Sequence, residues 1–145
     1  MLREIGFRVY LVTDRRLFSG IDGLLEGIEE ALKGGVKAVQ VREKDLTTRE
    51  LLSLSYRMRD VTGRYGASLF INDRADIALA VGAEGVHLGQ ASMPVRAVRK
   101  VLPDDMLIGV STHSVEEALQ AEEERADFIT IGPVFPTPSK LRYGA

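Results

Sequence analysis

The chain has 145 residues, of which 45% are hydrophobic and 28% are charged, and its formal net charge at pH 7 is −2. This length suits one domain with a hydrophobic core, and the nearly balanced charge argues against nucleic acid as the main partner. The absence of cysteine excludes disulfides, thiolate metal sites and a cysteine nucleophile. No membrane-length apolar run or signal-peptide pattern is found, so we expect a single cytoplasmic domain over residues 1–145, without membrane contact.

Short β-rich runs alternate with amphipathic helical patterns along the chain. The predicted strands are Val9–Thr13, Ala38–Arg42, Ser68–Ile71, Gly85–Leu88, Leu107–Val110 and Phe128–Ile131. The predicted helices are Asp22–Lys33, Thr48–Tyr65, Arg74–Val81, Pro94–Leu102 and Val115–Glu124. Two of these helices begin with capping-box patterns, Thr47-x-x-Glu50 and Ser114-x-x-Glu117. Regular alternation of this kind predicts an α/β fold with a parallel sheet and helical crossovers.

The second predicted strand favours a closed barrel over an open sheet. Val39 and Val41 point to one face, whereas Gln40, Arg42 and Lys44 point to the other. A central strand of an open doubly wound sheet is usually apolar on both faces, whereas a barrel strand can place polar groups inside near its carboxyl end. An exposed edge strand is the alternative. We therefore expect a (β/α)8 TIM-barrel type of fold.

Polar or glycine-containing segments follow the predicted strands. They include Asp14–Arg16, Arg42–Lys44, Asn72–Arg74, His87–Gln90, Ser111–His113 and Gly132–Lys140. In a barrel these segments converge on one mouth, where free backbone N–H groups can also bind anions.

The side chains in these segments suit a phosphorylated ligand. The cations are Arg42, Lys44 and Lys140, and the hydrogen-bonding groups are Asn72, Ser111, Thr137 and Ser139. Asp73 is a hard oxygen ligand suited to Mg²⁺ with phosphate oxygens at its other positions. These residues alone predict a phosphate-ligand barrel enzyme that stabilises a departing diphosphate.

Six motifs resemble those of the thiamine phosphate synthase family, in the family's order. They are Tyr10-Leu-Val-Thr-Asp14, Gln40-Val-Arg-Glu-Lys44, Ile71-Asn-Asp73, Gly85-Val-His-Leu-Gly-Gln90, Ile108-Gly-Val-Ser-Thr-His113 and Gly132-Pro-Val-Phe-Pro-Thr-Pro-Ser-Lys140. The resemblance implies a transferase that joins 4-amino-2-methyl-5-(diphosphooxymethyl)pyrimidine to a thiazole phosphate, giving thiamine phosphate and diphosphate. Diphosphate would leave first, and the thiazole nitrogen would capture the resulting pyrimidine carbocation.

The same resemblance implies residue roles. The pyrimidine diphosphate would be bound by Gln40, Val41, Arg42, Glu43, Lys44, Asn72, Ser111 and Lys140, and the thiazole phosphate by Thr137, Pro138 and Ser139. Of these, Arg42, Lys44, Ser111 and Lys140 would be catalytic, and Asp73 would bind the Mg²⁺ cofactor. The implied partners are these small-molecule substrates, and a homo-oligomer is left open.

Some of these residues also have structural interpretations. Asn72 could form a turn, Asp73 could cap the following helix, and Ser111 could serve only in a turn. We interpret His87 as support for the barrel interior rather than an acid–base group.

The chain departs from the family pattern in two respects. Ser92 stands where the family usually has a second metal-binding aspartate, and it could instead cap the next helix. Six strand patterns are present where a closed barrel has eight, so we expect the last two β/α units, at the C-terminal end of the barrel, to be missing.

Two alternative functions remain. A thiazole tautomerase on the same fold would use His113, but that relative lacks the Gln-x-Arg-x-Lys pattern of Gln40–Lys44. A non-catalytic phosphate-ligand-binding protein is the second alternative.

Overall fold

The computed structural model describes residues 4–139. Within this range the strands are β1 (Tyr10–Val12), β2 (Ala38–Val41), β3 (Ser68–Asn72), β4 (Gly85–Leu88), β5 (Leu107–Thr112) and β6 (Phe128–Ile131). The helices are α1 (Gly20–Lys33), α2 (Thr48–Arg64), α3 (Ala75–Val81), α4 (Val95–Val101) and α5 (Val115–Glu123). The predicted alternation is therefore confirmed, and a short 3-10 helix, η1 (Arg15–Leu17), was not predicted from the sequence patterns.

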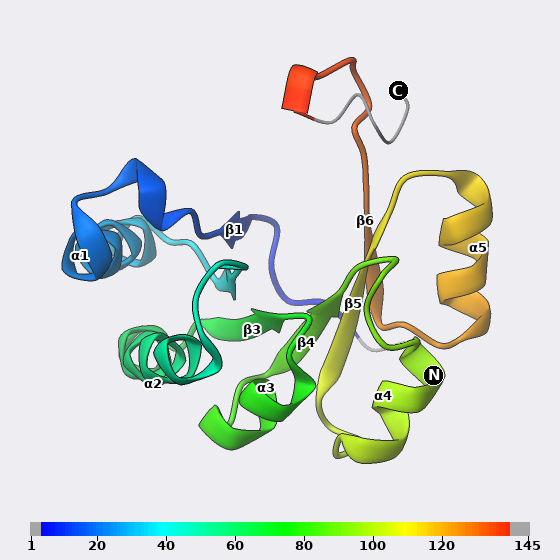
Figure 1. Ribbon diagram of the computed structural model, residues 1–145, viewed down its shortest axis with the longest axis horizontal. Helices are drawn as coiled ribbons and strands as arrows, with labels where there is room; N and C mark the ends of the chain where they lie inside the picture. The colour runs from blue at the N-terminus through cyan, green and yellow to red at the C-terminus, as the bar shows by residue number, and fades with distance from the viewer. Residues whose placement is uncertain (1–3, 140–145) are drawn as a thin grey trace.

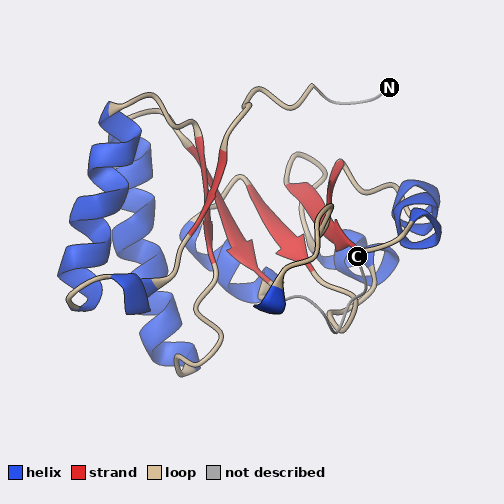
Figure 2. Ribbon diagram, turned by 90° about the horizontal axis from the view of Figure 1, so that it is seen from above, coloured by secondary structure: helices blue, strands red, loops and turns tan. Residues whose placement is uncertain are grey.

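All six strands form one parallel sheet in the order β1-β2-β3-β4-β5-β6. The sheet is curled, and the helices lie on its outer side, as Figures 1 and 2 show. This arrangement confirms the predicted α/β fold of TIM-barrel type, here as a six-stranded, partly closed barrel. No helix among residues 4–139 is long and apolar enough to cross a membrane.

The main hydrophobic core lies between the outer face of the sheet and the helices. Val39, Leu69 and Ile108 of the strands are fully buried there, against side chains such as Leu24 of α1 and Met58 of α2. Full burial of such a side chain contributes about 1.5–3 kcal/mol. This core holds the helices to the sheet and leaves the inner face of the barrel available for other side chains.

An aromatic cluster fills the inner side of the sheet toward the amino-terminal ends of the strands. Phe7, Tyr10, Phe70 and Phe128 pack with ring centroids 5.4–5.8 Å apart, mostly edge to face. His87 joins the cluster at 5.5 Å from Tyr10 and 5.7 Å from Phe128. Because Tyr10 belongs to β1 and Phe128 to β6, these rings join the two outermost strands across the interior without strand pairing.

Gly109 makes room for this cluster. Parallel pairing places Gly109 of β5 between His87 of β4 and Phe128 of β6. A Cβ atom at Gly109 would collide with the Phe128 ring and lie 2.8 Å from His87 Nδ1. Gly85 has a similar place one strand away, where a Cβ would lie 2.7 Å from the Phe70 ring. These glycines are needed for close approach and not for an unusual backbone angle.

An arginine–carboxylate pair fastens the amino-terminal ends of β3 and β4. The Arg59 guanidinium of α2 donates to both oxygens of Glu84 at 3.0 and 2.9 Å. Glu84 also accepts from the backbone N–H of Leu69 at 2.6 Å. The same guanidinium donates to the carbonyls of Gly82 and Ala67. The Arg59 side chain thereby connects α2 to the residues that directly precede β3 and β4.

The same arrangement recurs two strands further along. Arg99 of α4 donates to Asp127 at 2.8 Å, and Asp127 accepts from the N–H of Ile108 at 2.7 Å. Arg99 also donates to the carbonyls of Met106 and Arg125. Each acid directly precedes a strand and each arginine lies on the helix before the neighbouring strand. This end of the barrel is therefore built for stability, which is its usual role in the fold.

The two predicted capping boxes have different outcomes. At α2, Thr47 and Glu50 form the full reciprocal box. At α5, Ser114 accepts from Glu117 N, but the Glu117 carboxylate accepts from the N–H of His113 instead of the N–H of Ser114. The predicted capping box at Ser114 is therefore only half right.

Gly109→Ala should lower the free energy of unfolding by about 1–3 kcal/mol, because the added methyl group overpacks the space between His87 and Phe128. Urea unfolding followed by circular dichroism measures this change. Gly63→Ala is the matched control, since a Cβ on that α2 glycine meets nothing within 4 Å, and alanine there should be neutral or stabilising. Equal stability of the Gly109→Ala variant and the unchanged protein would contradict this packing argument.

Candidate active site

An open cavity of about 960 Å³ lies at the carboxyl ends of the strands. Eight residues that the sequence assigned to substrate or metal line it, namely Gln40, Val41, Arg42, Glu43, Lys44, Asn72, Asp73 and Ser111. They come from β2, β3 and β5 and the loops that follow β2 and β3, so the predicted convergence of these loops is observed.

The remaining predicted residues lie elsewhere. Thr137, Pro138 and Ser139 are exposed and do not line the cavity, and Thr137 Oγ1 donates to the carbonyl of Phe135. The segment that follows β6 rises away from the sheet in Figure 1. Lys140 lies outside the described residues. The roles of these four residues in binding therefore stay predictions.

Arg42 and Lys44 bring uncompensated positive charge to the cavity wall. The alternation along β2 places Gln40 and Arg42 on the inner face, as the sequence pattern predicted. Among the ion pairs of residues 4–139, none involves the side chain of Arg42 or Lys44. Two cations without a protein counter-charge favour an anionic ligand.

Glu43 lies between these two cations in sequence but is held by protein donors. Its side chain is 2% exposed and forms an ion pair with Arg15 at 3.2 Å. It also accepts from Thr13 Oγ1 at 2.6 Å and from the backbone N–H of Arg15 at 3.0 Å. Both carboxylate oxygens are engaged, so Glu43 contributes to the cavity mainly by holding its wall in place.

A hydrogen-bonded chain of neutral side chains runs beneath the cavity floor. His87 is buried, with Nδ1 at 3.1 Å from the Tyr10 hydroxyl and Nε2 at 2.9 Å from Ser111 Oγ. Burial, and to a lesser extent the nearby Arg42 charge, lowers the pKa of His87 to about 4. His87 is therefore neutral at physiological pH and must accept at one ring nitrogen and donate at the other.

The tautomer of His87 sets the direction of these hydrogen bonds. When Nδ1 carries no proton, the Tyr10 O–H donates to it and Nε2–H donates to Ser111 Oγ, and in the other tautomer both bonds run the opposite way. Burial raises the pKa of the Tyr10 hydroxyl, so Tyr10 keeps its proton at physiological pH.

Gln40 Oε1 has no hydrogen-bond partner among residues 4–139. The residue is 4% exposed and lines the cavity. An unpaired buried acceptor is unfavourable, at about 1–3 kcal/mol, unless a ligand supplies a donor. The site thus offers an acceptor at Gln40 and a hydroxyl at Ser111 on one polar floor.

Asp73 projects a carboxylate at the end of β3. Its backbone adopts a left-handed conformation with φ 65°, and its N–H donates to the carbonyl of His87 at 2.7 Å. Asp and Asn adopt this conformation more readily than other non-glycine residues. Asp73 does not cap α3, because the cap position is Arg74 and no side chain caps that helix, so the interpretation of Asp73 as a capping residue is wrong.

The donor set of the cavity fits Mg²⁺ only as a one-carboxylate site. Among the described residues no group of three metal-binding side chains is found, and Asp73 is exposed on the cavity wall. Mg²⁺ is commonly bound by one or two carboxylates with phosphate oxygens and water completing its shell. Asp73 meets that requirement when a phosphorylated substrate is present.

Ser92 closes a turn at the cavity rim. Its Oγ accepts from the N–H of Gly89 at 2.9 Å, whereas the cap position of α4 is Pro94. The alternative interpretation of Ser92 as a helix cap is therefore wrong. Beside it, Gln90 donates to the carbonyl of Ser111 at 2.8 Å and so fixes the end of β5.

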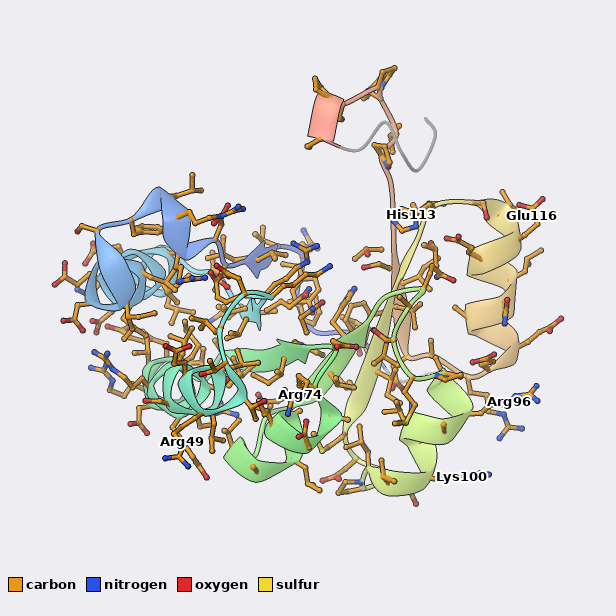
Figure 3. All side chains as sticks on the ribbon, viewed as in Figure 1. Arg49, Arg74, Arg96, Lys100, His113 and Glu116 are labelled. Carbon is orange, nitrogen blue, oxygen red and sulfur yellow. The ribbon has the colours of Figure 1, made fainter. Side chains whose placement is uncertain are left out.

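His113 and Glu117 form a pair at another part of the wall. His113 Nδ1 lies 3.2 Å from Glu117 Oε2, which also accepts from the His113 N–H at 2.6 Å. Figure 3 shows His113 where β5 gives way to α5, whereas the labelled cations Arg96 and Lys100 of α4 point outward from the barrel. The glutamate thus fixes the orientation of the histidine.

Several cavity residues were not recognised from the sequence. Tyr10 and Thr130 line the cavity from the outermost strands, and Glu117 lines it from α5. The period-2 alternation of β1 and β6 could have indicated Tyr10 and Thr130, as it did Gln40. The capping-box pattern indicated that Glu117 would turn back toward the start of α5, but with Ser114 and not His113 as its partner.

Comparisons with known proteins point to one family. A family model described as "Thiamine monophosphate synthase" matches residues 9–143. A "Putative thiamine-phosphate synthase" of Geobacter sulfurreducens is 54% identical over 143 residues, which cover 99% of this chain and 67% of that protein. A "Thiamine-phosphate synthase" of Clostridium novyi is 47% identical over 137 residues, covering 94% of this chain and 67% of that protein.

Solved structures agree with this similarity. A thiamine phosphate pyrophosphorylase from Pyrococcus furiosus has a TM-score of 0.82 and 43% identity, over 90% of this chain and 62% of that chain. A structure described as "Native KDPGal structure" has a TM-score of 0.51 at 14% identity, which is a likeness of fold alone. The chain spans roughly two thirds of the length of the synthases that it matches.

The neutral state of His87 should make the protein less stable in mild acid. Its folded-state pKa of about 4 lies below the unfolded value of 6.5, so the unfolded chain binds more protons and stability falls as pH drops between them. From pH 7 to 4.5 the histidine should account for about 2 kcal/mol of lost unfolding free energy. Urea titrations at both pH values should show this loss reduced by that amount in His87→Gln.

Between pH 7 and 8 the two proteins should change in parallel, since the histidine is neutral in both states there. An equal loss of stability between pH 7 and 4.5 in both proteins would show that His87 is not held neutral by burial.

Proposed function

Because the chain belongs to the thiamine monophosphate synthase family, we propose that it is a Mg²⁺-dependent transferase that uses 4-amino-2-methyl-5-(diphosphooxymethyl)pyrimidine and a thiazole phosphate. The products are thiamine phosphate and diphosphate. The similarity to named synthases does not favour the tautomerase or the non-catalytic binding protein as alternatives. We propose that this reaction takes place in the cavity at the carboxyl ends of β2, β3 and β5.

The observation that carries the proposal is the pair of cations on the cavity wall. Arg42 and Lys44 lie two residues apart in the segment directly after β2, and both line the cavity. Neither forms an ion pair among the described residues. A diphosphate gains negative charge as its bond to carbon breaks. Preorganised cations therefore stabilise the transition state more than the bound substrate, which is the condition for catalysis.

In the proposed reaction the bond between the pyrimidine methylene carbon and the diphosphate oxygen breaks, and the electron pair leaves with diphosphate. The thiazole nitrogen then forms a bond to that carbon. Neither step needs a protein nucleophile. The chain's contribution is to bind the diphosphate through Arg42 and Lys44 and to hold the ring in place.

The polar floor is proposed to bind the aminopyrimidine ring. Gln40 Oε1 is a buried acceptor without a partner in the described part of the chain, which suits the exocyclic amino group. The Ser111 hydroxyl, which is hydrogen-bonded to His87 Nε2, suits a polar atom of the substrate.

Asp73 would hold Mg²⁺, which supplies positive charge to the departing diphosphate oxygens when bound. Asn72 precedes it on the same cavity wall and can donate to a phosphate oxygen. Ser92 does not add a second carboxylate, and its hydroxyl already accepts from Gly89. Metal affinity is therefore proposed to depend on Asp73 and the substrate together.

Arg42→Ala should raise the dissociation constant of the pyrimidine diphosphate by about 10- to 100-fold, since a charge-assisted hydrogen bond contributes about 1.5–3 kcal/mol. Isothermal titration calorimetry with Mg²⁺ present measures this directly. Arg96→Ala, which removes the same charge from an exposed position on α4, should leave the affinity nearly unchanged. Equal binding by the Arg42→Ala variant and the unchanged protein would rule out the proposed anion site.

Asp73→Asn should raise the Mg²⁺ concentration needed for half-maximal binding of the pyrimidine diphosphate by about tenfold. Ser92→Asp should lower that concentration, because it adds a carboxylate at the cavity rim and retains an acceptor for the N–H of Gly89. Calorimetry over a series of Mg²⁺ concentrations measures both. Substrate binding that is indifferent to Mg²⁺ and to the Asp73 change would refute the metal assignment.

A further inference from the structure

We infer that Arg15 is a positioning residue for the diphosphate site, acting through Glu43 and Asp45 on the two cations Arg42 and Lys44. Arg15 does not itself line the cavity. It lies in η1, a loop element after β1, and the inference rests on the proposed function of the cavity that β2 lines.

The Arg15 guanidinium holds the residues on both sides of Lys44. It donates to Glu43 Oε1 at 3.2 Å, and to the two oxygens of Asp45 at 2.6 and 2.8 Å. A planar guanidinium matches a carboxylate in this two-pronged geometry, which a lysine cannot reproduce. Because Glu43 and Asp45 flank Lys44 in sequence, the backbone at Lys44 is fixed at both neighbours.

Thr13 extends this network to Arg42. Its Oγ1 donates to Glu43 Oε2 at 2.6 Å and accepts from the backbone N–H of Arg42 at 3.0 Å. The backbone N–H of Thr13 donates to the carbonyl of Gln40 at 2.9 Å. The segment that carries the cations is thus tied to η1 and to Thr13 after β1 by bonds to its backbone and to its acids. These bonds do not use the side chains of Arg42 and Lys44, which form no ion pair among the described residues.

The network also removes competing negative charge. Glu43 is buried, and a buried carboxylate needs a cation and hydrogen bonds. Hydrogen bonding by Arg15 lowers the pKa of Asp45 to about 2, so this acid stays ionised and paired over the physiological range. The charge of Arg16 also acts on both acids, but it forms no hydrogen bond with either among the described residues. Without Arg15, the two acids would lose their paired guanidinium, and pairing with the adjacent Arg42 and Lys44 would oppose the binding of a diphosphate.

Arg16 provides a matched comparison within the same turn. It carries the same charge one residue away and is also paired, but with Asp14 at 2.9 Å. Its side chain is largely exposed, and no hydrogen bond among the described residues joins it to Glu43 or Asp45. A general effect of positive charge near the cavity would be similar for both arginines, whereas a positioning effect belongs to Arg15 alone.

A double-mutant cycle with calorimetry tests the inference on the whole 145-residue chain, with the pyrimidine diphosphate and Mg²⁺ as the probe. Arg15→Ala should weaken binding about tenfold, whereas Arg16→Ala should change it less than about twofold. In the Arg42→Ala background, Arg15→Ala should add less than about twofold, because the residue it positions is gone. Arg15→Lys, which restores charge without the planar fork, should recover only part of the affinity.

Each outcome of this cycle has a defined meaning. Equal effects of Arg15→Ala and Arg16→Ala, or effects of Arg15→Ala and Arg42→Ala that simply multiply, would overturn the positioning role. If Arg15→Ala does not fold by circular dichroism, Asp45→Asn removes an exposed part of the network and should give the same coupling to Arg42. Absence of binding by the unchanged chain would instead refute the proposed function, so the two failures are distinguishable.

Discussion

The parallel register of the six strands is the constraint on which the rest of the structure depends. Alternate residues of each strand face the helices or the barrel interior, and parallel pairing aligns these faces from strand to strand. Outward residues such as Val39 and Leu69 form the helix-covered core. Inward residues such as Gln40 and His87 form the floor of the cavity. A slip of one residue would exchange the two sets.

The interior changes character along the barrel axis. Aromatic rings fill the amino-terminal end, and Gly109 leaves the space they require. Polar side chains line the carboxyl end. His87 lies at the boundary, where its ring packs against Phe128 and its nitrogens bond Tyr10 and Ser111. Burial keeps the ring neutral, so one ring nitrogen donates and the other accepts in its bonds to Tyr10 and Ser111.

Charge is arranged differently at the two ends of the sheet. At the amino-terminal ends, Arg59 and Arg99 are fully engaged with carboxylates and backbone carbonyls, which suits a stabilising role. At the carboxyl ends, Arg15 neutralises the acids beside the cavity, and Arg42 and Lys44 have no ion-pair partner within residues 4–139. Positive charge is therefore available where an anionic substrate would bind and is balanced where the fold needs only stability.

The sequence by itself determined the order of strands and helices, the barrel class and the inward position of Gln40 and Arg42, because periods of 2 and 3.6 residues are local properties. It also indicated Asp73 and Ser111 as cavity residues. Only the tertiary structure decided that Glu43 is held by Thr13 and Arg15, and that Tyr10 and His87 bond across 77 residues. Sheet register and loop packing bring such partners together, so the contact cannot be predicted from the sequence around either residue.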